Sequence, residues 1–182
     1  MIRIVFLCAG LFLSLNVTTI AQGKYKISKS EVSFFSDAPM EDIEATNSDA
    51  QGIVDFDSKN FLIKVPVKSF KFKSSLMEEH FNENYMESEK YPYTVFKGKI
   101  QGSYDLKKDG EYPVNAVGDL NLHGVSQQRT IPSVIVVKNG ISTFRSKFNI
   151  KLADHKIDIP TVVFQKIAEV VEVKLDGVLV KI

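Results

Sequence analysis

Apolar and polar side chains alternate along most of this 182-residue chain, and this alternation constrains the fold more than any other feature. A period of two residues places every second side chain on one face of a half-buried β-strand. The segments that show it have these apolar or small residues on one face: Phe61, Ile63, Val65 and Val67; Thr94, Phe96, Gly98 and Ile100; Tyr112, Val114, Ala116, Gly118, Leu120 and Leu122; Phe144, Phe148, Ile150 and Leu152; Val171, Val173 and Leu175. The chain is therefore predicted to be all-β.

Short turn signals separate these segments, at Lys108-Asp109-Gly110, Lys138-Asn139-Gly140 and Asp176-Gly177. One-sided strands joined by short hairpins form antiparallel sheets with one solvated face. Seven or eight strands in about 160 residues most easily close into a barrel, which also removes exposed sheet edges. We expect a single barrel domain, since no repeat, linker or low-complexity segment divides the chain.

One segment, residues 76–86, has a helical period instead. Met77, Phe81 and Tyr85 recur every four residues and form an apolar stripe that can dock on the barrel. The helix is predicted to end before Pro92, because a proline disfavours helical backbone in the residue before it. The acidic and amide side chains of this stretch are then the solvent face and the ends of a short amphipathic helix.

The N-terminus has the pattern of a secretory signal peptide over residues 1–21. Arg3 precedes a short apolar run from Ile4 to Leu15, and Thr19 and Ala21 occupy the small-residue positions of a cleavage site. Cleavage would leave a domain of residues 22–182 in the periplasm or secreted; the alternative is an uncleaved anchor. The run is shorter than the roughly 20 residues of a membrane span, so an integral membrane protein is not expected.

The composition of the remaining chain narrows its chemistry. The only cysteine of the 182 residues, Cys8, lies in the predicted signal peptide. Thiol chemistry and cysteine metal sites are therefore excluded in the mature domain. Without Arg3 the number of Lys and Arg falls from 23 to 22, equal to the 22 Asp and Glu. A chain without net charge is not expected to bind nucleic acid.

Four stretches resemble, in order, the conserved blocks of the YceI-like family. They are "LMEEHFNENYMESEKYPYTVFKG" (76–98), "AVGDLNLHGVSQQRTIP" (116–132), "FNIKLADHKIDIP" (148–160) and "AEVVEVKLDGVLVKI" (168–182). The resemblance implies an eight-stranded antiparallel, lipocalin-like β-barrel with one short inserted helix. It also implies a bacterial envelope protein whose elongated apolar cavity holds an isoprenoid or other lipid. Leu152 and His155 depart from the family pattern, which bears on the ligand's identity more than on the cavity.

The inward faces of the predicted strands mix large and small side chains, and this mixture leaves room for a ligand in a small barrel. The candidate lining residues are Phe96, Gly98, Ile100, Ala116, Gly118, Phe144, Phe148 and Ile150. In the alternative, the small residues only fit the taper of a filled barrel. The predicted function is accordingly binding of a long apolar ligand for storage or transport. The alternative is a filled barrel that acts as an envelope interaction or stress-response module.

Polar sites are few. Lys71 and Lys73 lie on one side of an extended segment and could hold a phosphate head group, although a solvated strand end with lysines guarding an edge explains them more simply. His80, His123 and His155 lack the spacing of metal ligands, and Asp154-His155 is expected to be a solvated hairpin. No catalytic or phosphate-loop motif is present. We therefore expect no metal, no cofactor and no enzymatic activity, while a homodimer remains open.

Overall fold

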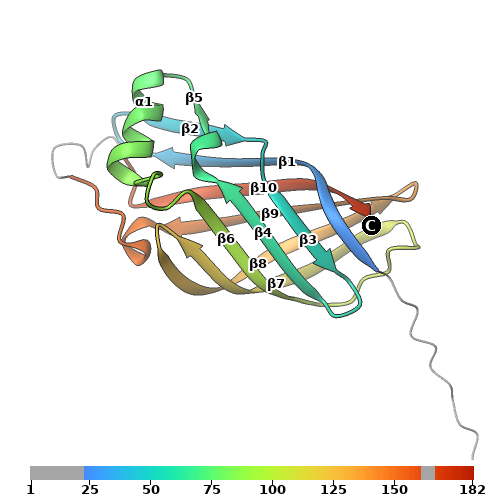
Figure 1. The fold of residues 1–182 in the computed structure, drawn as a ribbon. Helices are drawn as coiled ribbons and strands as arrows, with labels where there is room; N and C mark the ends of the chain where they lie inside the picture. Colours follow the sequence, from blue (N-terminus) through green and yellow to red (C-terminus); the bar gives the residue numbers. More distant parts are fainter. Residues whose placement is uncertain (1–22, 161–166) are drawn as a thin grey trace, which may run out of the picture.

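A computed structural model describes residues 23–160 and 167–182, so the predicted signal peptide and its cleavage site lie outside the described residues and stay a prediction (Figure 1). The described residues are mainly strands, with one short helix. In chain order the elements are β1 (Lys24–Asp37), β2 (Asp42–Asn47), β3 (Gln51–Asp55), β4 (Asn60–Pro66), η1 (Val67–Ser69), β5 (Lys71–Phe72), α1 (Ser75–His80), η2 (Phe81–Tyr85), β6 (Tyr93–Gln101), β7 (Gly110–Leu122), β8 (Val125–Lys138), β9 (Ile141–Lys151), η3 (Leu152–His155) and β10 (Val170–Lys181).

The strands form one closed antiparallel sheet. Its order is β10-β9-β8-β7-β6-β4-β3-β1-β2-β5, and β1 also pairs with β10, which closes the ring. The N-terminal part of β1 pairs with β3 and its C-terminal part with β2, so β2 and β3 occupy one strand position. In the same way β5 pairs with β2 where β4 pairs with β3. The ten strands therefore occupy eight positions, which confirms the predicted eight-stranded barrel.

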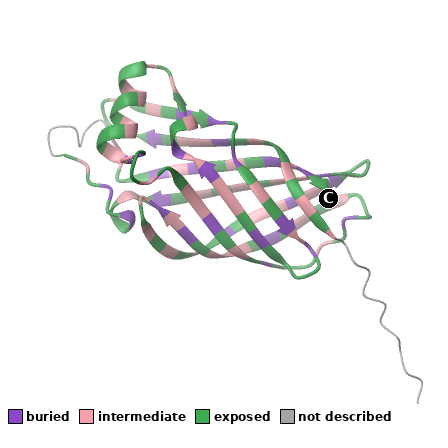
Figure 2. Ribbon diagram, in the orientation of Figure 1, coloured by how far each residue is buried: buried purple, intermediate pink, exposed green. Residues whose placement is uncertain are grey.

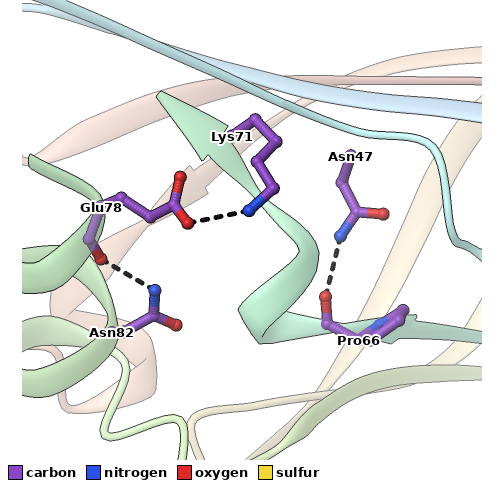
Figure 3. Close-up of polar contacts among 5 residues, drawn as sticks. All are labelled: Asn47, Pro66, Lys71, Glu78 and Asn82. Carbon is purple, nitrogen blue, oxygen red and sulfur yellow. Dashed lines mark hydrogen bonds and ion pairs between the residues drawn. The ribbon is translucent and has the colours of Figure 1, made fainter. Parts of the chain in front are cut away.

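Asn47 links the break between β2 and β3 to the break between β4 and β5. Its side chain is almost fully buried at the end of β2, and its Nδ2 donates to the Pro66 carbonyl at 2.8 Å (Figure 3). Its Oδ1 accepts from the Asp49 amide at 2.8 Å. These bonds satisfy polar groups that the interrupted strands leave without ladder partners. Beyond this point β2 and β5 continue toward α1, which lies over this end of the barrel (Figure 1).

Two hairpins have the tightest geometry. Asn139 and Gly140 join β8 to β9, and His123 and Gly124 join β7 to β8, each pair with positive φ at both residues. Positive φ at both central residues is the type I′ hairpin, which matches the right-handed twist of the strands. The predicted turn at Lys138–Gly140 is thus confirmed.

The predicted turn at Asp176-Gly177 is wrong. Gly177 lies inside β10, where it pairs with Ser30 on one side and with Phe144 on the other. A Cβ atom on this glycine would come within 2.3 Å of the Phe144 ring. The glycine therefore serves close packing of an aromatic ring on the strand, a use of glycine that resembles a turn signal in the sequence.

The barrel is closed at the end opposite α1. Tyr25 packs edge-on against Phe56 at 5.3 Å between ring centroids, and Phe56 packs against Tyr104 at 5.2 Å. The Tyr104 hydroxyl donates to the Phe56 carbonyl at 3.0 Å, which fixes the loop after β6 beneath the barrel. Buried and exposed residues alternate along the strands above this floor (Figure 2).

Candidate functional site

The barrel encloses an apolar cavity of about 620 Å³. This volume falls within the range of roughly 300–1,000 Å³ that is typical of small-molecule pockets. The wall runs from Phe56 at the closed end to Leu76 and Met77 of α1 at the other. Nearly every strand contributes alternate residues, because the inward face of a barrel strand repeats every two residues.

Most of the lining residues predicted from the sequence are in this wall. The structure places there Phe96, Ile100, Ala116, Phe144, Phe148 and Ile150. They come from β6, β7 and β9, the strands in which the alternation was clearest. That they contact a ligand stays a prediction.

The prediction that Gly98 and Gly118 line the cavity is wrong, because neither lies in its wall. They face each other across β6 and β7, and an added Cβ would come within 2.1 Å of the Val117 carbonyl oxygen or 2.0 Å of the Lys97 carbonyl oxygen. Their missing side chains let two backbones approach closely, and they do not leave room in the interior.

Sequence reasoning missed the contribution of β8. Ile131, Ser133 and Ile135 of this strand line the cavity at alternate positions. The signal was present as an i, i+2, i+4 pattern, but Pro132 and Val134 between them obscured the polar half of the alternation. Prolines are uncommon inside sheets, so Pro132 weakens the strand signal further.

The inserted helix forms part of the rim at the open end. The structure confirms a helical segment, although only Ser75–His80 is α-helical and Phe81–Tyr85 continues as a wider π-helical turn. Met77, Phe81 and Tyr85 all line the cavity, as the apolar stripe predicted. Phe81 stacks on Phe34 of β1 at 5.5 Å, and it also contacts the rings of two residues near β5, Phe70 and Phe72.

Neither predicted head-group lysine lies in the cavity wall. Lys71 is exposed and its Nζ lies 2.9 Å from Glu78 Oε1 of α1 (Figure 3). The same helix is tied internally, because Asn82 Nδ2 donates to the Glu78 carbonyl at 2.8 Å. Lys73 is exposed two residues further along. A phosphate-binding role for either lysine stays a prediction.

The three histidines have three different environments. His80 lies at the rim of the cavity. His123 Nε2 lies 2.8 Å from Glu87 Oε2, and its Nδ1 lies 3.2 Å from the His155 carbonyl oxygen. His155 is fully buried, so the expected solvated hairpin at Asp154-His155 is wrong. The short η3 turn folds back over β8, where His155 Nδ1 donates to the Val125 carbonyl at 3.2 Å.

Charged side chains are confined to the rim. Among the described lining residues the acidic and basic ones are Glu41 and His80, both at the α1 end. Tyr85 adds no charge, because burial raises the pKa of its phenol. Within residues 23–160 and 167–182, no group of three or more His, Asp or Glu is placed to hold a metal ion. In the same ranges no helix is long and apolar enough to cross a membrane.

The YceI-like domain model matches residues 24–179, almost the whole described chain. This chain belongs to the YceI-like family. No curated protein matches this chain. Its structural neighbours include a polyisoprenoid binding domain from Saccharophagus degradans, with a TM-score of 0.74 and 14% identity over 87% of this chain and 98% of the other. BcnA of Burkholderia cenocepacia gives a TM-score of 0.68 and 20% identity, covering 82% of this chain and 95% of that one. At these identities the likeness shows that the three share the fold.

Proposed function

We propose that this YceI-like protein binds a long apolar ligand, an isoprenoid or another lipid, inside its barrel and stores or transports it. The observation that carries the proposal is the apolar cavity of about 620 Å³ between Phe56 and α1. Each methylene group buried there contributes about 0.8 kcal/mol, so even ten offset much of the cost of association. The structural neighbour from Saccharophagus degradans is a polyisoprenoid binding domain, which supports this class of ligand.

Binding of this kind requires no catalytic group, so we further propose that the protein is not an enzyme. The charged side chains of the described wall lie at the rim, and the wall below them is apolar apart from a few hydroxyl groups. Export to the periplasm or beyond, proposed from the N-terminal pattern, would place the protein beside the membranes in which such ligands dissolve.

Native mass spectrometry of protein purified from its own cells, followed by organic extraction, tests the binding function. We expect a co-purified lipid whose mass accounts for the difference between the native and denatured species. Repeated extracts without lipid, together with no binding of an added long-chain probe, would instead favour the filled-barrel interaction module. The intact mass of the same sample tests export, which predicts an N-terminus at Gln22.

A further inference from the structure

Two serine hydroxyls lie together on the wall of the cavity, well below its rim. Ser133 of β8 and Ser146 of β9 are direct cross-strand partners, and their Oγ atoms are 2.7 Å apart. Both line the cavity, between Ile131 and Ile135 on one strand and between Phe144 and Phe148 on the other. The alternation of the two strands directs both side chains inward.

Each hydroxyl hydrogen of this serine pair has an acceptor within hydrogen-bond distance. Both hydroxyl hydrogens have acceptors when the Ser133 hydroxyl donates to the Ile131 carbonyl at 3.2 Å and Ser146 donates the short bond between the two Oγ atoms. Each hydroxyl has one hydrogen and two acceptor sites. One acceptor site of Ser133 is used by Ser146, and three acceptor sites of the pair are left facing an otherwise apolar space.

Spare acceptor sites in an apolar cavity favour a ligand group that donates to them, since one hydrogen bond contributes about 0.5–1.5 kcal/mol. The surrounding side chains offer no donor, because the inward neighbours on β8 and β9 are Ile131, Ile135, Phe144 and Phe148. The other described polar groups of the wall have a different place. Glu41, Ser74, His80, Tyr85 and Thr94 belong to the α1 end, and Ser36 accepts from the Ala168 amide at 2.8 Å.

We infer that the serine pair is a subsite for a hydroxyl group, and that the ligand is an uncharged long-chain alcohol whose O–H donates to Ser146 or Ser133. This inference rests on the proposed function and names the ligand class within it. Inside the cavity a phosphate or carboxylate would meet no cation at the serine pair, because the charged groups of the described wall lie at the rim. Arg145 and Lys147, on either side of Ser146 in β9, are exposed and form ion pairs with Glu111 and Glu172. A pure hydrocarbon would leave the acceptor sites unpaired.

Displacement of N-phenyl-1-naphthylamine by 1-dodecanol, 1-methoxydodecane and dodecane tests this subsite. Ser146→Ala and Ser133→Ala remove one hydroxyl each with little change of volume. We expect each to weaken dodecanol binding roughly 2- to 10-fold, the worth of one hydrogen bond, and to leave the ether and the alkane unchanged. Ser142→Ala is the matched control, because Ser142 is a buried serine of the same strand that does not line the cavity.

The failures are distinguishable. If the native protein takes up neither dodecanol nor dodecane, the proposed function itself fails. If both bind, and the Ser133 and Ser146 variants weaken neither or weaken both alike, the cavity stands and the hydroxyl subsite is overturned. Loss of ether binding equal to that of dodecanol would overturn the inference that the ligand is the donor.

Discussion

Gly98 of β6 and Gly118 of β7 lie directly opposite each other, with no room for a side chain on either. A Cβ atom on Gly118 would come within 2.0 Å of the Lys97 carbonyl oxygen and 2.6 Å of the Gly98 Cα. Both contacts are with backbone, which cannot rotate away as a side chain can. The close approach of these two strands is therefore a property of the barrel wall that only glycine permits.

Gly118→Ala is expected to lower the free energy of unfolding by about 3 kcal/mol or more, because the methyl group must push the two strands apart. Gly140→Ala is the control. Gly140 has a φ of 75° and nothing within 4 Å of its Cβ position, so that change meets only the strain of left-handed backbone, about 1–2 kcal/mol. Urea denaturation of both variants measures the difference. Equal losses would show that separating the two strands costs no more than the left-handed strain at residue 140.

Ala116→Phe should fill the cavity and abolish uptake of a long-chain fluorescent probe. Ala116 faces inward on β7 and lines the cavity, whereas Asn115 beside it is exposed on the outer face. Overpacking costs about 1–3 kcal/mol, so circular dichroism must first show that the variant is folded. Asn115→Phe adds the same ring outside and should bind the probe normally. Unchanged binding in folded Ala116→Phe would place the ligand elsewhere.

Phe81→Ala should destabilise the protein by about 2–3 kcal/mol. A fully buried phenylalanine costs about 3–5 kcal/mol on truncation, but one side of this ring faces the cavity. Glu83→Gln, an exposed position two residues away, should change the free energy of unfolding by no more than about 0.5 kcal/mol. Thermal melts that ranked these variants in the opposite order would contradict the packing of η2 against the barrel.

His155 should make the protein less stable in mild acid. Burial lowers the pKa of His155 from its ordinary value of 6.5, and the nearby Arg129 acts in the same direction. The unfolded chain therefore binds a proton that the folded protein does not, and stability is lost as pH falls below about 6.5. The slope from this one group is at most about 1.4 kcal/mol per pH unit.

Urea denaturation of wild type and His155→Gln at pH 7.5 and 5.5 measures this contribution. The variant should lose less stability between the two pH values than wild type does, whatever its absolute stability. His80→Gln, at an exposed position on α1, should keep the wild-type pH dependence. An identical slope in all three proteins would mean that His155 takes up its proton without opening the η3 turn.

The sequence by itself determined the local features of this fold. Alternation in β6, β7 and β9 predicted strands and their inward faces, because a strand exposes every second residue to one side. The Met77-Phe81-Tyr85 stripe predicted a helical segment against the barrel, and Asn139-Gly140 predicted a hairpin. Each signal depends on backbone geometry over a few neighbouring residues, which is why it can be read without the tertiary structure.

Only the tertiary structure decided what several identical residue types do. The sequence pattern predicted cavity space at Gly98 and Gly118 and a turn at Gly177, yet each glycine accommodates a group from a neighbouring strand. His155 was read as solvated and is buried by the return of η3 onto β8. The Ser133–Ser146 pair exists only because the β8–β9 register sets the two residues side by side. These roles depend on contacts between strands, and a sequence does not state which of its distant residues the closed barrel brings together.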